Sequence, residues 1–192
     1  MRRFNSAVAV LYLLQSAGCA DVATTDPAGE ATVTIKLQSD AFAAGEPIPR
    51  RYAGEGEDVS PPLSWTTLPE GTRELALVCD DPDAPTPEPW VHWVIYKIPP
   101  TEKGLPEGLP AKERLQTPVG ARQGRNSWPS GQTIGYRGPL PPPGHGIHHY
   151  HFQIYALDTP IDLPAGADKK ALLQTMQGHI LAKGELVGTY ER

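Results

Sequence analysis

The sequence lacks a basic cluster. It carries 17 lysines and arginines against 22 aspartates and glutamates, which gives a formal net charge of −5 with neutral histidines. No run of lysine or arginine interrupts this acidity, so the chain has no general electrostatic attraction for phosphate backbones. We therefore expect no nucleic-acid partner.

The N-terminal apolar run is too short to cross a membrane. Residues 7–14 are eight apolar residues, whereas a bilayer-spanning helix needs about 20. Two arginines precede the run, and small residues lead from it into Cys19. This order predicts an export signal over residues 1–18. Small residues before a cysteine resemble a bacterial lipobox, which predicts lipidation of Cys19; plain secretion with an unmodified thiol is the alternative.

Cysteine is scarce, because Cys19 and Cys79 are the only two. With Cys19 acylated, no intramolecular disulfide can form, and burial of a core has to stabilise the domain. Cys79 ends an apolar run, which is typical of a buried thiol without a function. Residues 19–31 lack periodicity and large apolar groups, and we interpret them as a flexible tether. The predicted location is the cell envelope, on the periplasmic side of a bacterial membrane and anchored to it by lipid.

Proline is abundant, with 22 residues beside 19 glycines. Proline is tolerated mainly at turns and strand edges, so this composition favours a turn-rich, mainly β protein over a helical bundle. We expect one domain over residues 32–192, since no repeat or linker divides it. Strands are predicted over 33–38, 75–80, 91–98, 151–157 and 185–190. Asp168 is expected to cap a helix whose apolar residues Leu172, Met176 and Ile180 recur every four positions.

Two acids follow a buried strand in a proline-braced loop. Asp81 and Asp83 lie in Asp-Pro-Asp-Ala-Pro, and His92 comes nine residues after Asp83. These side chains could take part in binding. The alternative is that the acids cap turn amides and the histidine packs within its strand.

A second polar cluster, residues 145–151, follows the other proline-rich loop. Alternate residues of a strand share a face, so His148 and Tyr150 point one way while His149 and His151 point the other. If both loops meet at one end of a sandwich, His148 and Tyr150 join the acids and His92 in one pocket. A purely structural role for each is again the alternative.

The sequence gives little support for a metal site or for a serine-hydrolase active site. No paired Cys-x-x-Cys or helical His-x-x-x-His occurs, and histidines that alternate across a strand cannot all reach one ion. No Gly-x-Ser-x-Gly elbow is present either. We expect no metal and no cofactor, and a hydrolase using the Asp/His cluster is a third and weaker hypothesis.

Several motifs follow one another in a fixed order along the chain. They are Asp58–Trp65, Asp81–Pro85, Trp90–Trp93, Gly135–Pro139 with Pro142–His145, and His148–Asp158. This series resembles the phosphatidylethanolamine-binding protein (Raf kinase inhibitor protein) family, and the C-terminal residues 176–190 look like its bacterial branch. The resemblance spans about residues 33–192.

The resemblance implies an antiparallel β-sandwich with Greek-key connections and a C-terminal helix, and a small pocket for phosphate-like or carboxylate-like anions. Matched motif by motif, the implied ligand-binding residues are Asp81, Asp83, His92, Gly138, Pro139, His148 and Tyr150. His149 stands where the family often has arginine. A carboxylate bonded to imidazole favours the charged ring, whose other N–H would face the anion.

The predicted function is non-enzymatic binding of a small anionic or phosphorylated ligand, similar to a phospholipid headgroup, by an envelope lipoprotein. The alternative is inhibition of a kinase or protease partner, as the family resemblance also implies. A protein partner or a homodimer is therefore compatible with the sequence. The family has no common reaction, and a fold does not imply a function.

Overall fold

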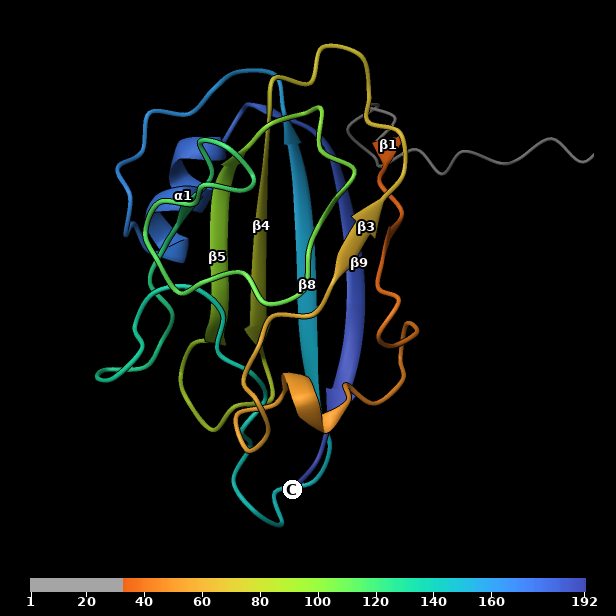
Figure 1. The fold of residues 1–192 in the computed structure, drawn as a ribbon, viewed down its shortest axis with the longest axis vertical. Coiled ribbons are helices and arrows are strands. Elements are labelled where there is room, and N and C mark those ends of the chain that lie inside the picture. The colour runs from red at the N-terminus through yellow and green to blue at the C-terminus, as the bar shows by residue number, and fades with distance from the viewer. Residues whose placement is uncertain (1–32) are drawn as a thin grey trace, which may run out of the picture. The chain divides into compact units, whose positions relative to one another are not determined.

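The protein is described by a computed structural model over residues 33–192. Its large sheet has the strand order β1-β9-β8-β4-β5-β7, and its small sheet has the order β2-β3-β6 (Figure 1). Neighbouring strands are antiparallel except β1 and β9, which are parallel. The elements are β1 (Val33–Thr34), β2 (Leu37–Gln38), η1 (Arg50–Tyr52), β3 (Leu63–Trp65), β4 (Glu74–Asp81), β5 (Trp90–Ile98), β6 (Gly104–Leu105), β7 (Arg122–Gln123), β8 (His148–Leu157), α1 (Lys169–Met176) and β9 (Ile180–Tyr190).

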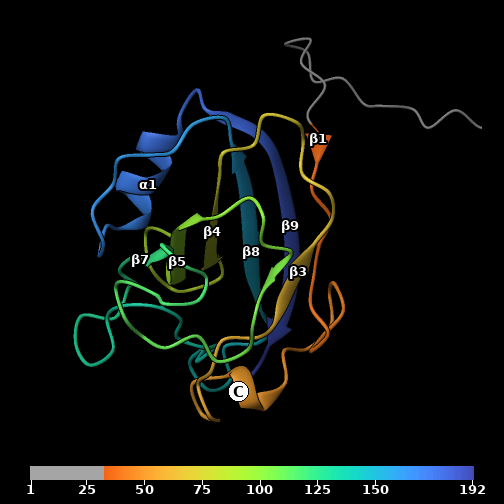
Figure 2. The same ribbon diagram turned by 45° about the horizontal axis from the view of Figure 1, so that its top comes forward.

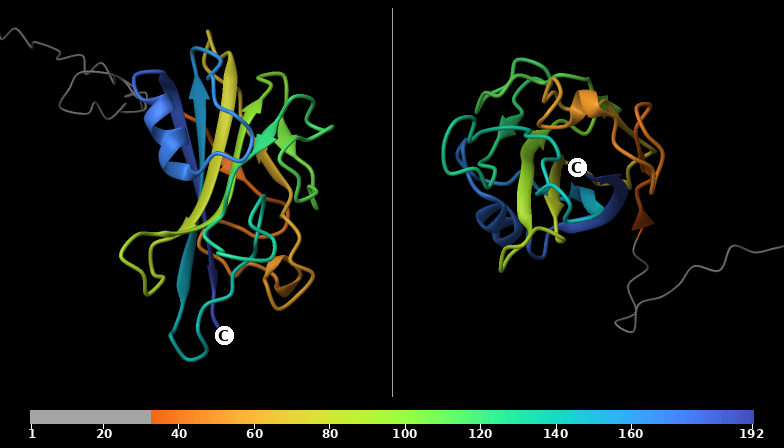
Figure 3. Two further views of the ribbon diagram at one scale, coloured as in Figure 1. Left: turned by 90° about the vertical axis from the view of Figure 1, so that its left-hand side faces the viewer. Right: turned by 90° about the horizontal axis from the view of Figure 1, so that it is seen from below.

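The large sheet lies between two apolar layers. On one face, residues such as Trp93 and Phe152 pack against the small sheet and its loops. On the other face, residues such as Val78 and Val94 pack against Leu172 of α1. Figure 3 shows the helix lying along this face of the large sheet. Strand β4 is buried along its whole length because it is covered on both faces, as its continuous apolar sequence predicts. The expected mainly β sandwich with a C-terminal helix is confirmed.

The helix ends earlier than its apolar spacing predicts. The Asp168 carboxylate accepts a 2.8 Å hydrogen bond from the Ala171 amide and caps α1 as expected. The helix stops at Met176, and Gly178 follows with φ of +82°. This left-handed conformation favours glycine and turns the chain. Ile180 therefore begins β9 and is not part of the helix.

Two strand predictions also change. The predicted strand over 33–38 divides into β1 and β2, which belong to different sheets. Ile35 lies between them and is buried in the core of the sandwich. The last strand runs for 11 residues, longer than predicted, since it pairs with the whole of β8.

Three long strands place their polar ends together. Asp81 at the end of β4 lies opposite Trp90 at the start of β5, and Asp80 lies opposite His151 near the start of β8. At the sheet edge, β7 lies beside β5 (Figure 2). No helix within residues 33–192 is long and apolar enough to cross a membrane. The predicted signal peptide (1–18) and the predicted tether (19–31) precede this region, and both lie outside the described residues.

Candidate functional site

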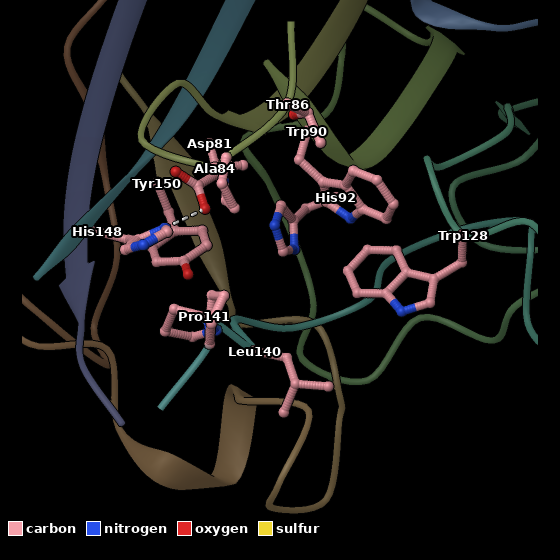
Figure 4. Close-up of a pocket in the computed structure, with 12 residues that line it drawn as sticks. Asp81, Ala84, Thr86, Trp90, His92, Trp128, Leu140, Pro141, His148 and Tyr150 are labelled. Carbon is pink, nitrogen blue, oxygen red and sulfur yellow. Dashed lines mark hydrogen bonds and ion pairs between the residues drawn. The ribbon is translucent and has the colours of Figure 1, made fainter. Parts of the chain in front are cut away.

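A pocket opens where β4, β5 and β8 meet the proline-rich loop before β8 (Figure 4). Its volume is about 220 Å³. In the close-up, Asp81, His148 and Tyr150 lie on one side, His92 in the middle, and the tryptophans on the other side. The lining residues are Asp81, Ala84, Pro85, Thr86, Trp90, His92, Trp128, Leu140, Pro141, Pro142, His148 and Tyr150.

Asp81 both caps a turn and holds a histidine. Its Oδ1 accepts a 2.8 Å hydrogen bond from the Asp83 amide. Its Oδ2 accepts a 2.7 Å bond from Nδ1 of His148. The side chains of Asp81 and His148 are only 4% and 1% exposed. The two roles that the sequence left as alternatives are therefore combined in one carboxylate.

The second ring nitrogen of His148 is also engaged. Its Nε2 lies 2.8 Å from Nδ1 of His145, an exposed residue. A turn closed by the His145 amide and the Pro142 carbonyl, 3.1 Å apart, brings His145 to this position. The expectation that this nitrogen faces the ligand is therefore not met. No sequence pattern indicates the contact, because it depends on the shape of the loop.

His92 is neutral near neutral pH. Desolvation by burial lowers its pKa to about 4, although the Arg137 carbonyl and nearby acids oppose this shift. Nδ1 lies 2.6 Å from the Arg137 carbonyl oxygen, so Nδ1 carries the proton and donates it. Nε2 is then a hydrogen-bond acceptor. This differs from the charged donor expected from the sequence, because the ring is only 2% exposed and its Nδ1 bonds to a carbonyl and not to a carboxylate.

Tyr150 has a buried hydroxyl group that no other described residue satisfies. Its side chain is 1% exposed and lines the pocket. Its hydroxyl lacks a hydrogen-bond partner within residues 33–192. Burial raises its pKa well above the usual value, and the Asp81 carboxylate adds to this through its charge and its closeness to the hydroxyl, so the hydroxyl keeps its proton. An unpaired buried donor costs about 1–3 kcal/mol, so the hydroxyl is a strong candidate to donate a hydrogen bond to a molecule in the pocket.

Aromatic rings form the opposite wall. Trp128 packs edge-on against Trp90 and His92, with ring centroids 5.4 Å and 5.0 Å apart. The Arg137 guanidinium lies 4.7 Å from the Trp128 ring centroid. Sequence reasoning missed Trp128, whose only local sign is a large aromatic residue within a loop rich in serine, glycine and proline.

Asp83 points away from the pocket. Its carboxylate is 41% exposed and lies 2.7 Å from Nδ1 of His149, which is 49% exposed. The same carboxylate accepts a 2.8 Å bond from the His149 amide. Asp83 follows Asp81 by two residues but does not line the pocket, so the structure does not place it with His92, His148 and Tyr150.

Gly138 and Pro139 position the loop without lining the pocket. The Gly138 amide donates a 2.6 Å bond to Asp58. A Cβ atom at Gly138 would lie 2.0 Å from the Tyr52 carbonyl oxygen, so only glycine fits. The Pro139 carbonyl accepts a 2.8 Å bond from Gly54. These contacts hold the next residues, Leu140 to Pro142, against the cavity.

Within the described residues we find neither a metal-binding cluster nor a reactive cysteine. In residues 33–192, no group of three or more histidine, cysteine, aspartate or glutamate side chains is arranged to hold a metal ion. Cys79 is buried, and burial raises its thiol pKa well above the usual value. The predicted lipidation site, Cys19, lies outside the described residues.

The family model described as phosphatidylethanolamine-binding protein matches residues 38–191. The chain belongs to the phosphatidylethanolamine-binding protein family. A relative from Methanothermobacter thermautotrophicus, named UPF0098 protein, is 49% identical over 158 residues, which are 82% of this chain and 99% of the relative. LppC of Mycobacterium tuberculosis, whose name marks it as a proposed lipoprotein, is 39% identical over 171 residues, 89% of this chain and 78% of LppC.

Solved structures of phosphatidylethanolamine-binding protein homologues have the same fold. The Chlamydia trachomatis homologue CT736 superposes with a TM-score of 0.71 at 38% identity, covering 83% of this chain and 98% of its own. Escherichia coli YbcL, a member of the same family, superposes with a TM-score of 0.74 at 32% identity, covering 83% and 99%.

Proposed function

We propose that this phosphatidylethanolamine-binding protein family member binds a small phosphorylated or carboxylate ligand, similar to a phospholipid headgroup, in the pocket between β4, β5 and β8. The observation that carries the proposal is the Tyr150 hydroxyl, unpartnered within residues 33–192, in a cavity that neutral His92 also lines; the Nδ1 of His92 is bonded to Arg137, which leaves its Nε2 as the acceptor. One group donates a hydrogen bond and the other accepts one.

This pairing favours an acid that keeps one proton. A singly protonated phosphate offers a P–O⁻ acceptor for Tyr150 and a P–OH donor for His92. A fully ionised phosphate lacks the donor. Since the second pKa of a phosphate ester is about 6, a phosphate monoester such as phosphoethanolamine should bind more tightly at pH 6 than at pH 8. In this proposal the titrating proton belongs to the ligand and not to His92.

The surroundings of the cavity also suit a small ligand. A volume of about 220 Å³ corresponds to a headgroup-sized molecule, given that water occupies roughly 30 Å³ in the liquid. Proline and tryptophan side chains give the cavity apolar walls, and a hydrogen bond is stronger in less polar surroundings. The Asp81 carboxylate accepts two hydrogen bonds from the protein, which stabilise its negative charge.

Binding without turnover fits this geometry better than hydrolysis. Both oxygens of Asp81 accept bonds from the protein, so the carboxylate is poorly placed to activate a water molecule. His92 could act as a base, but its low pKa makes it a weak one. We therefore propose a non-enzymatic role, and release of inorganic phosphate from phosphoethanolamine would contradict it.

Titration calorimetry with inorganic phosphate tests the binding proposal. We expect Tyr150→Phe to weaken binding roughly tenfold, because one hydrogen bond to a charged group is lost. Tyr155→Phe is the matched control, since Tyr155 lies on the same strand but its hydroxyl bonds to Gln153 on the other face. Equal affinity of wild type and Tyr150→Phe, or no binding by wild type, would overturn the proposal.

We also propose that Cys19 carries a lipid that anchors the protein to the periplasmic side of a bacterial membrane. The basic start, short apolar run and small residues before Cys19 support this, as does the similarity to LppC. Mass spectrometry of the mature N-terminus should find an acylated cysteine, and Cys19→Ala should leave the protein unacylated. An unmodified N-terminal residue other than Cys19 would contradict the proposal.

A further inference from the structure

Three side chains form a line from solvent to the wall of the pocket. His145 is exposed and does not line the cavity. Its Nδ1 lies 2.8 Å from Nε2 of His148, and Nδ1 of His148 lies 2.7 Å from Oδ2 of Asp81. Asp81 is 3% exposed. The line thus reaches a buried carboxylate from the outside of the loop and not through the mouth of the pocket.

When both histidines are neutral and Asp81 is a carboxylate, this line has a single consistent arrangement of protons. The Asp81 carboxylate can only accept, so Nδ1 of His148 carries the proton. Nε2 of neutral His148 is then an acceptor, and Nδ1 of His145 must donate to it. This leaves Nε2 of His145 free to exchange with solvent.

One additional proton can enter without breaking any of these contacts. It binds Nε2 of His145, which becomes an imidazolium that still donates through Nδ1. If that Nδ1 proton moves to Nε2 of His148, one N–H bond breaks, another forms, and His145 is left neutral with its proton on Nε2. The positive charge then resides on His148, in the wall of the pocket.

The groups around the two histidines do not provide this proton. Tyr150 and Cys79 lie beside Asp81, and their raised pKa values keep both protonated at neutral pH. His92 on β5 has a pKa of about 4 and stays neutral. Outside β4, the nearby carboxylate is that of Asp83, which bonds to His149. The C-terminal Arg192 contacts the Pro141 carbonyl at 3.3 Å and has a fixed charge.

We infer that His145 is a positioning residue that couples ligand binding to proton uptake: it donates a hydrogen bond to Nε2 of the His148 tautomer that Asp81 sets, and it admits a proton from solvent when an anion enters the pocket. This rests on the proposed function. An anion beside Asp81 makes a positive charge on His148 more favourable, so binding and protonation reinforce each other by linkage.

The test is titration calorimetry of the full chain with inorganic phosphate at pH 7 in buffers of different ionisation enthalpy. His145→Gln keeps an amide donor for His148 but cannot take a proton. We expect its proton uptake per phosphate to be lower than that of wild type by up to about one proton. The proton bound by phosphate itself contributes to both proteins, so the difference belongs to His145. His179→Gln is the control, because His179 is an exposed histidine paired with Asp158 at 3.0 Å.

A second measurement examines the tautomer directly. Long-range ¹H–¹⁵N spectra of wild type at pH 8 should show neutral His148 protonated on Nδ1. Binding with equal proton uptake in wild type and His145→Gln, or His148 protonated on Nε2, would overturn the inference while the proposed function stands. No phosphate binding by wild type would overturn the proposed function and the inference together.

Discussion

Two neighbouring residues of β8 make the same contact in opposite surroundings. His148 bonds to Asp81 and His149 bonds to Asp83, both at 2.7 Å. The first pair is 1% and 4% exposed, and the second is 49% and 41% exposed. Water screens the exposed pair, and such pairs contribute about 0–1 kcal/mol. The buried pair has no water to replace its partners, so its loss costs much more.

The exposed pair of Asp83 and His149 keeps a small electrostatic interaction despite screening by water. Partial burial acts to raise the pKa of Asp83, but hydrogen bonds and charge from His149 outweigh it and lower the pKa. A carboxylate whose pKa is lower in the folded than in the unfolded protein stabilises the fold at pH values above its unfolded pKa. This stability is lost as the pH falls through the folded pKa. Because Asp83 is well exposed, the effect is small.

The largest expected effect comes from removing the buried carboxylate. Asp81→Ala removes two hydrogen bonds to a charged acceptor, which predicts a loss of about 3–5 kcal/mol in the free energy of unfolding. Asp83→Ala, the matched change in the exposed pair, should cost at most about 1 kcal/mol. Urea denaturation at pH 7 measures both. Similar losses in the two variants would contradict the contrast drawn between the pairs.

Acidification should destabilise the pocket through His92. Its folded pKa of about 4 lies below the ordinary histidine value of 6.5, so the unfolded chain binds more protons between these values. Stability is therefore full above about pH 6.5 and falls as the pH drops toward 4, by roughly 3 kcal/mol in total. His92→Gln should flatten this part of the profile of unfolding free energy against pH. An unchanged slope would contradict a buried neutral His92.

The smallest expected effect concerns ligand affinity, for which we compare variants of His149 and His148. His149→Gln should leave the phosphate affinity within about twofold of wild type, since an exposed pair on the other face contributes little. His148→Gln should weaken binding by about tenfold or more, because Asp81 loses its partner. Calorimetry at pH 6 compares the two. Equal losses would mean that burial does not separate their roles.

The alternation of side chains between the two faces of a strand explains which part of the contrast between the two histidine–aspartate pairs the sequence predicts. The alternation of residues along β8 is enough to place His148 and Tyr150 on one face and His149 on the other. The same local rules identify β4, β5 and the Asp168 cap, because continuous apolar runs and capping residues act over short distances. The pocket residues Asp81 and His92 follow from the ends of these strands.

Long-range packing decides what the sequence does not predict. The distance of Asp83 from the pocket depends on its bond to His149, and the position of Trp128 depends on a loop folded against β5. His145 reaches His148 only through the turn at Pro142. The neutral state of His92 depends on its depth of burial, which no local pattern predicts.

A crystal structure of the full chain grown with phosphate at pH 6 tests the central claim most directly. The account predicts a phosphate in the pocket with oxygens about 2.5–3.2 Å from the Tyr150 hydroxyl and from Nε2 of His92. Asp81 should keep its contact with His148. A phosphate bound at His149 on the exposed face, with the pocket unchanged and Tyr150 still unpartnered, would contradict it.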